Sequence, residues 1–333
     1  MSKGLVYPLN LQRANDTGRG LISSAWATLM QHCFFEISTA RSHEQKLYPY
    51  MNRTVIAGVS GIRRFALVMV LSIEACAMAH ANHPVSDLED SVCGIVREPL
   101  AFWQFRQVAG ALDASRIRSI RNIERLSFTT RDGRELGGYK LRADNPQGYL
   151  LVAQGNAVLA DQIMGVLTFF QGYGLDVYVY DYRGYGLSEG KSRLKAIVSD
   201  YREIVAALNA QGYGRRYLYG MSMGGVILTN AIGPSEEYDA LVLDSPPSRI
   251  SGLGCPENYD PVRNLPQDGA KLMLIIGLKD RVVPPEDIEE LSQVLAQRGG
   301  RVLKSPEFAH PLMDLDSTIL RRRLQSVADF LVR

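Results

Sequence analysis

The sequence lacks an excess of charge of either sign. Its 37 Lys and Arg residues against 35 Asp and Glu residues give a formal net charge of +2 over 333 residues. Domains that bind nucleic acid carry a strongly basic surface. We therefore expect no nucleic-acid partner.

Cysteine, glycine and proline are too scarce for several structural classes. Four Cys, 30 Gly and 15 Pro exclude a disulfide-dense scaffold, a collagen and a low-complexity disordered chain. The 46% of hydrophobic and 22% of charged residues are typical of a soluble globular protein. At about 150 residues per domain, the length suits one large domain or two ordinary ones.

The apolar stretch at residues 65–73 is too short to cross a membrane, because a transmembrane helix takes about 20 residues. Two arginines at 63–64 precede this stretch, and small residues follow it. This order predicts a signal peptide over residues 51–81, with cleavage after Ala79 or Ala81. We therefore expect a periplasmic or secreted protein.

Two other interpretations of this segment stay open. It would be an ordinary buried helix in a chain that is not exported. If Cys76 is lipidated, or if the leader is left uncleaved, the protein would be held at a membrane. Residues 1–50 show no sustained periodicity, and we interpret them as a non-native or disordered extension ahead of a true start at Met51.

Cleavage of the leader would change both the charge and the cysteine content. Of the charged residues, 8 basic and 4 acidic ones precede Asn82, so 29 basic and 31 acidic residues remain and the net charge becomes about −2. Only Cys93 and Cys255 are left. Two remaining thiols in an exported protein often pair, but two unrelated buried thiols fit the sequence equally well.

Beyond residue 120, two kinds of apolar pattern alternate along the chain. Residues 120–139 predict an antiparallel hairpin that turns at Asp132-Gly133. We then expect strands at 149–153, 177–181, 216–219, 240–243, 272–276 and 302–304, and helices at 161–171, 199–209, 223–231, 285–295 and 317–331. Strands separated by helices predict the α/β class, with helices on both faces of a mostly parallel sheet. One domain at 120–333, after a lead-in at 82–119, accounts for the pattern.

The segment Gly220-Met221-Ser222-Met223-Gly224 has the pattern G-x-S-x-G and joins a predicted strand to a predicted helix. In this setting the serine lies in a strained turn, and a Cβ two residues to either side would collide with neighbouring backbone. The hydroxyl of Ser222 would then project above the sheet as a nucleophile. The backbone N–H of Met223 would point to where an oxyanion forms.

This turn gives the chain a resemblance to the alpha/beta hydrolase superfamily, in its small-capped esterase, lipase and serine-aminopeptidase-like branch. The resemblance covers about residues 120–333 and implies the chain order nucleophile, acid, histidine. It places the acid at Asp280 in LMLIIGLKDRVVPPED, with Asp244 in LVLDSPP as the competing acid, since some branches use the preceding strand. It places the base at His310 in EFAHPLM, the one histidine of the predicted fold.

Two further segments match this branch. The resemblance implies that the backbone N–H of Asn156 in VAQGNAV is the second oxyanion donor, although Gln154 departs from the histidine often found there. The segment DYRGYGLSEGK from Asp181 resembles a loop that shapes the active site in this branch. It is not a phosphate-binding loop, because Tyr185 stands where the opening glycine is needed. We expect no cofactor, and no metal, because the histidine and the cysteines of the fold lack ligand spacing.

The resemblance implies a serine hydrolase that forms an acyl-enzyme on Ser222, with a small-molecule acyl substrate. The insertion at 246–271, where this fold carries its cap, is too short for a helical lid, so we expect an open site for short-chain esters, thioesters or small amides. A non-catalytic binding protein with the same fold remains an alternative, as does an acyltransferase that uses the same three residues.

Overall fold

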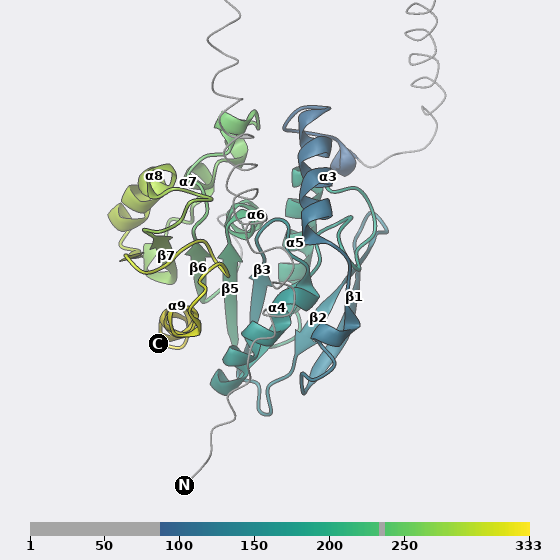
Figure 1. Cartoon of the computed structure of the whole chain (residues 1–333), viewed down its shortest axis with the longest axis vertical. Coiled ribbons are helices and arrows are strands. Elements are labelled where there is room, and N and C mark those ends of the chain that lie inside the picture. Colours follow the sequence, from purple (N-terminus) through teal and green to yellow (C-terminus); the bar gives the residue numbers. More distant parts are fainter. Residues whose placement is uncertain (1–86, 233–236) are drawn as a thin grey trace, which may run out of the picture. The chain divides into compact units, whose positions relative to one another are not determined.

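The computed structural model describes residues 87–232 and 237–333 (Figure 1). The predicted extension at 1–50 and the predicted signal peptide at 51–81, including Cys76, lie outside the described residues. Among the described residues, no helix has both the length and the apolar character needed to span a bilayer.

Eight strands form a single sheet in the order β1-β2-β4-β3-β5-β6-β7-β8. The strands β1 and β2 form an antiparallel hairpin, β2 also pairs antiparallel with β4, and all other neighbours are parallel. Their bounds are β1 Ile123–Thr129, β2 Glu135–Leu141, β3 Gly148–Ala153, β4 Leu175–Tyr180, β5 Arg215–Met221, β6 Ala240–Asp244, β7 Leu272–Gly277 and β8 Arg301–Ser305. The predicted class, a mostly parallel sheet with helices on both faces, is confirmed.

Helices connect the strands and cover the sheet (Figure 1). The α-helices are α3 Arg97–Ala109, α4 Ala160–Leu167, α5 Leu194–Asn209, α6 Met223–Ala231, α7 Pro261–Asn264, α8 Pro285–Gln297 and α9 Ser317–Leu331. Short 3-10 helices are η1 Asp87–Glu89, η2 Ala114–Arg116, η3 Thr168–Tyr173, η4 Ser251–Leu253, η5 Glu257–Tyr259 and η6 Gly269–Lys271.

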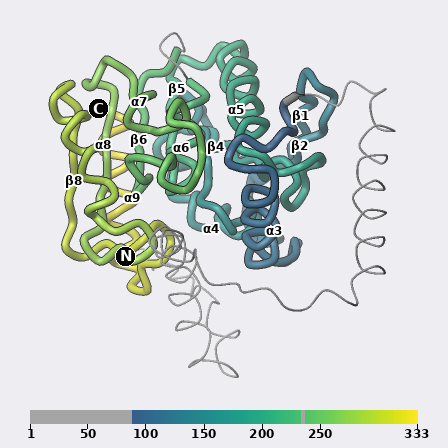
Figure 2. The backbone as a smooth tube through the Cα atoms, turned by 90° about the horizontal axis from the view of Figure 1, so that it is seen from above, coloured from purple at the N-terminus to yellow at the C-terminus, as the bar shows by residue number. Residues whose placement is uncertain are grey.

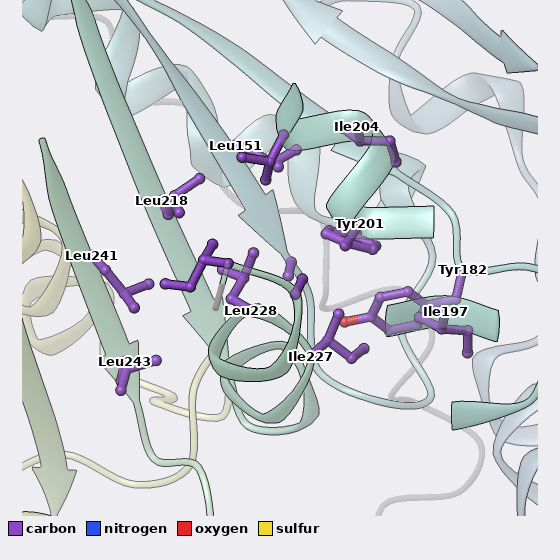
Figure 3. Packing of buried hydrophobic residues seen from close by; sticks show 14 of the residues in the cluster. Leu151, Tyr182, Ile197, Tyr201, Ile204, Leu218, Ile227, Leu228, Leu241 and Leu243 are labelled. Carbon is purple, nitrogen blue, oxygen red and sulfur yellow. The ribbon is translucent and has the colours of Figure 1, made fainter. Parts of the chain in front are cut away.

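The side chains of each central strand alternate between two cores, because successive residues of a strand point to opposite faces. Leu151 of β3 packs in a core with residues of α5, α6 and α8, whereas Leu150 packs in a core with residues of α4 and α9. Figure 3 shows the first core, where Leu218 and Leu241 face Leu228. The helices α5 and α6 lie side by side on this face (Figure 2).

Two helices begin or end four or more residues away from the predicted position. Helix α5 begins at Leu194, five residues before the predicted start, and the carboxylate of Glu98 accepts the N–H of Leu194 at 2.7 Å. The helix predicted to run to residue 171 narrows to 3-10 geometry at Thr168, whose hydroxyl donates to the carbonyl of Gly165 at 2.7 Å. At both positions the structure has a side-chain hydrogen bond that the apolar period does not report.

The predicted lead-in contains a helix, α3, that the sequence pattern did not reveal. Phe102 and Ala109 of α3 are buried, whereas Leu100, Trp103 and Val108 are exposed. Because apolar residues occupy both faces, the helix has no amphipathic period to detect.

A disulfide joins Cys93 to Cys255, which settles the alternative that the sequence left open. Close to it, the Arg97 guanidinium donates to the carbonyl of Leu253 at 2.9 Å. These two links tie the start of α3 to the segment between β6 and β7.

Candidate active site

The four strands β5 to β8 bring four loops to one edge of the sheet. Met221 lies opposite Asp244, Asp244 opposite Ile275, and Gly277 opposite Ser305. Because these strands are parallel, their carboxyl ends meet at the same edge. The residues that follow them, Ser222, Asp280 and His310, therefore leave the sheet on one side.

Ser222 links the end of β5 to the start of α6 in a strained conformation. Its φ of 51° and ψ of −117° are unusual for a residue with a side chain, and such a conformation costs about 1–3 kcal/mol. Two hydrogen bonds hold it: the N–H of Ser222 donates to Asp244 O at 2.8 Å, and the N–H of Gly225 donates to Ser222 O at 2.9 Å. The predicted strained turn is present.

The two flanking glycines are needed for close backbone packing. A Cβ on Gly220 would lie 2.7 Å from the carbonyl oxygen of Gly224, and a Cβ on Gly224 would lie 1.9 Å from that of Ala153. Real Cβ atoms do not approach this closely, so neither position accepts a side chain. The collision predicted from G-x-S-x-G is confirmed on both sides of Ser222.

Asp280 and His310 form a buried pair. Asp280 Oδ2 lies 2.8 Å from His310 Nδ1, while Asp280 Oδ1 accepts the N–H groups of Val282 and Val283 at 2.8 and 2.9 Å. The carboxylate is therefore fixed by the first turn of its own loop. With Nδ1 as the donor to Asp280, His310 Nε2 is left as an acceptor.

The loop of His310 packs directly on the loop of Asp280. The N–H of Lys279 donates to Phe308 O at 2.9 Å, and the N–H of Leu278 donates to Ser305 O at 2.9 Å. A Cβ on Gly277 would lie 2.5 Å from the carbonyl oxygens of Phe308 and Ala309. The glycine that ends β7 therefore permits the approach that pairs the carboxylate with the imidazole.

The turn after β3 lies beside Ser222. A Cβ on Gly155 would be 3.7 Å from the Cβ of Ser222. The side chain of the next residue, Asn156, is held by Tyr185, whose hydroxyl donates to Asn156 Oδ1 at 2.7 Å. Gln154 is fully buried, and its Nε2 donates to Tyr180 O at 2.9 Å. Its backbone carbonyl accepts the Tyr182 hydroxyl, so this residue supports the turn.

Asp244, the competing acid, has partners other than His310. Its Oδ1 accepts from Arg323 Nη1 at 2.7 Å, and its Oδ2 accepts from the Tyr219 hydroxyl at 2.8 Å. Complete burial raises the pKa of Asp244. Of the two candidate carboxylates, it is Asp280 that hydrogen-bonds to the imidazole.

The segment that begins at Asp181 forms a rigid loop beside the turn after β3. Asp181 Oδ1 accepts the N–H of Ala160 at 2.7 Å and Oδ2 accepts that of Leu187 at 2.9 Å. Burial raises the pKa of Asp181. Arg183, which is completely buried, pairs with Asp132 and Asp200. These contacts fit a structural role for the loop.

Helix α3 forms part of the surroundings of this site, which the sequence pattern did not indicate. The Tyr185 hydroxyl lies 3.4 Å from Phe102 O, and Arg106 donates to Gly184 O at 3.2 Å. Residues of α3 and of the loop at 184–186 line a cavity of about 280 Å³. Its lining residues are Arg106, Gln107, Gly110, Leu159, Gly184, Tyr185 and Gly186. Within residues 87–232 and 237–333, no three His, Cys, Asp or Glu side chains are grouped as a metal would require.

The central part of the chain is similar to a known protein family and to several known proteins. Residues 144–258 match the family described as serine aminopeptidase, S33. An uncharacterized membrane protein of Saccharomyces cerevisiae is 24% identical over 232 residues, which cover 63% of this chain and 79% of that protein. Alpha/beta hydrolase domain-containing protein 17C of Xenopus laevis is 27% identical over 214 residues, which cover 59% of this chain and 63% of that protein.

Solved structures share the fold. An alpha-beta hydrolase from Vibrio vulnificus superposes with a TM-score of 0.56 at 17% identity, covering 70% of this chain and 94% of its own. The esterase Pf2001 of Pyrococcus furiosus superposes with a TM-score of 0.52 at 18% identity, covering 63% of this chain and 91% of its own. At these low sequence identities, the similarity to the two solved structures shows the fold alone.

Proposed function

We propose that this chain of the alpha/beta hydrolase superfamily is a serine hydrolase that cleaves ester, thioester or small amide bonds. The observation that carries the proposal is the 2.8 Å contact between Asp280 and His310, at the sheet edge where the strained Ser222 also lies. The superfamily alone establishes no activity, so the proposal depends on these three residues.

In the proposed mechanism, His310 Nε2 takes the proton of Ser222 Oγ as the oxygen attacks the substrate carbonyl. A serine hydroxyl is a poor nucleophile near neutral pH, so the imidazole base supplies the activation. The imidazolium then gives the proton to the leaving alcohol, thiol or amine. Water, deprotonated by the same imidazole, hydrolyses the acyl-enzyme. Asp280 stays ionised, fixes the tautomer and stabilises the imidazolium.

The proposed oxyanion donors are the backbone N–H groups of Met223 and Asn156. Met223 is the first residue of α6, where backbone N–H groups have no partner within the helix. Asn156 belongs to the turn beside Ser222, and the contact of Tyr185 with its side chain supports a fixed backbone there.

The proposed substrates have short acyl groups and an open approach to Ser222. The insertion at 246–271 contains only η4, η5, α7 and η6, of which the longest has four residues. Such short elements can form a lip but not a long helical lid. A panel of p-nitrophenyl esters should therefore turn over best with short chains, and best turnover with long chains would contradict this part of the proposal.

We further propose that the protein lies in the periplasm or outside the cell. The support is the basic, apolar and small-residue order of residues 51–81, together with the disulfide between Cys93 and Cys255. Disulfides persist in oxidising compartments and are rare in the reducing cytosol.

Labelling with a fluorophosphonate probe tests the activity, because this reagent reacts only with an activated serine. We expect the wild-type chain to be labelled and both Ser222→Ala and His310→Ala to lose the label. Ser326→Ala, which removes a hydroxyl that donates to the backbone carbonyl of Arg322 within α9, is the matched control and should keep the label. A folded wild-type chain that takes up no label would leave a non-catalytic binding protein as the function.

A further inference from the structure

Of the two candidate acids, Asp244 and Asp280, both are buried and only one hydrogen-bonds to the imidazole of His310. Asp280 makes the 2.8 Å contact. The other carboxylate, Asp244 at the end of β6, is fully buried, and the charges of Arg323, His310 and Asp280 all act on its pKa, which burial raises. Some element of the structure therefore has to keep Asp244 from competing for the imidazole.

Arg323 of α9 is the partner of Asp244. Its side chain is 1% exposed, and its Nη1 donates to Asp244 Oδ1 at 2.7 Å. A buried carboxylate without such a partner is strongly unfavourable. The second oxygen of Asp244 is taken by the Tyr219 hydroxyl, so both oxygens of this carboxylate are occupied.

The same guanidinium also holds the loop of His310. Its Nε donates to Asp314 Oδ2 at 2.9 Å, its Nη2 donates to the carbonyl of Ala309, and its Cζ lies 4.5 Å from the ring centroid of Phe308. Asp314 closes the loop on itself, since its Oδ1 accepts the N–H of Ala309 at 2.8 Å. Arg323 therefore contacts the loop both before His310, at Phe308 and Ala309, and after it, at Asp314.

We propose that Arg323 is a positioning residue that fixes the loop of His310 and neutralises Asp244, so that the imidazole pairs with Asp280 alone. This inference rests on the proposed role of His310 as the base. Among the described residues, the charged groups tied to His310 or to its loop include Asp280 from the loop after β7, Asp244 from β6, Asp314 from the loop itself and Arg323 from α9. Glu307 of the same loop pairs with Arg322 at the surface. Removal of Arg323 leaves Asp244 and Asp314 without their shared cation, and these uncompensated carboxylates favour the imidazolium.

The effect is measured in two ways across four variants of the full chain. One readout is the pKa of His310 by NMR titration, with the resonance assigned by comparison with His310→Asn. The other is the pH dependence of the rate of fluorophosphonate labelling. The variants are Arg323→Met, the double variant Arg323→Met/Asp244→Asn, Arg323→Lys, and the control Arg322→Met, which removes an exposed cation paired with Glu307 from the same helix.

In Arg323→Met we expect the pKa of His310 to rise by about 0.5–1 unit, and the labelling rate to begin its increase at correspondingly higher pH. In the double variant the pKa returns part of the way toward the wild-type value, because Asp244 no longer carries a charge while Asp314 still lacks its cation. Arg322→Met leaves both readouts unchanged. An unchanged His310 titration in Arg323→Met, or an equal shift in the single and double variants, overturns the inference.

Arg323→Lys keeps the inference falsifiable if Arg323→Met does not fold. Lysine keeps the charge but cannot reproduce the planar fork that contacts Asp244, Asp314 and Ala309 together. We expect the pKa of His310 to stay near the wild-type value while kcat falls about tenfold with little change in KM. Unchanged kcat overturns the positioning role. Loss of labelling in the wild-type chain would instead contradict the proposed function, and the NMR titration still reports on Arg323 in that case.

Discussion

Asp280 Oδ2 lies 2.8 Å from His310 Nδ1, and the two residues reach this distance from loops that follow neighbouring parallel strands. The glycine at 277 leaves room for the histidine loop, and backbone N–H groups of the aspartate loop hold the carboxylate. The pair is therefore set by backbone packing as much as by the two side chains.

Asp280→Asn tests the importance of this carboxylate. An amide cannot stabilise the imidazolium and favours the wrong tautomer, so kcat/KM for a short-chain ester should fall by about 10³–10⁴-fold. Asp244→Asn provides the comparison at the other carboxylate, and its loss should be much smaller. Equal losses in steady-state kinetics, or a larger loss for Asp244→Asn, would contradict the assignment of Asp280.

Gly224→Ala tests the packing of α6 against β3. Its Cβ would meet the carbonyl oxygen of Ala153, and we expect a loss of about 3 kcal/mol or more in the free energy of unfolding. Gly165→Ala in α4 is the matched control, because nothing lies within 4 Å of its Cβ. The free energy of unfolding of this control should rise by about 0.5–1 kcal/mol, as expected when alanine replaces glycine within a helix. Urea unfolding measures both, and similar values for the two variants would contradict the packing argument.

Glu98→Gln tests the capping of α5 by a residue 96 positions away. The two carboxylate oxygens of Glu98 accept the N–H groups of Cys93 and Leu194, each at 2.7 Å. Since hydrogen bonds to a charged group are worth about 1.5–3 kcal/mol, we expect the free energy of unfolding, measured by thermal denaturation, to fall by about 2 kcal/mol. Glu124→Gln, on an exposed part of β1, should change stability by less than about 0.5 kcal/mol. A stability loss no greater than that of the control would show that the cap is dispensable.

Reduction tests the disulfide between Cys93 and Cys255. The bond closes a long loop, with a sequence separation of 162, and such bonds stabilise by about 2–5 kcal/mol. Dithiothreitol should therefore lower the Tm of the wild-type chain. The double variant Cys93→Ser/Cys255→Ser should begin at the lower Tm and not respond to the reagent. A wild-type Tm that is the same with and without reductant would mean that the bond contributes no stability.

The sequence was most informative where backbone sterics decide the structure. Gly220 and Gly224 around Ser222, between a predicted strand and a predicted helix, predicted the strained turn, because a Cβ at either glycine would collide with neighbouring backbone. The spacing of apolar residues predicted the order of strands and helices, because the periods of a buried strand and of a helix follow directly from backbone geometry.

Features that depend on distant partners could not be predicted in this way. Helix α3 has apolar side chains on both faces, and α5 takes its cap from Glu98 in another element. Arg323 resembles its neighbours Arg321 and Arg322 in the sequence, and only tertiary packing makes it buried. A single helical period cannot tell a buried arginine from two exposed ones.

The links between α3 and the rest of the fold bear on where the folding unit begins. A chain shortened to the predicted domain at 120–333 would leave Cys255 with a free thiol and the first turn of α5 without its carboxylate acceptor. It would also open the side of the cavity that Arg106 and Gln107 line. A stable recombinant fragment should therefore start upstream of Cys93, well before the first strand.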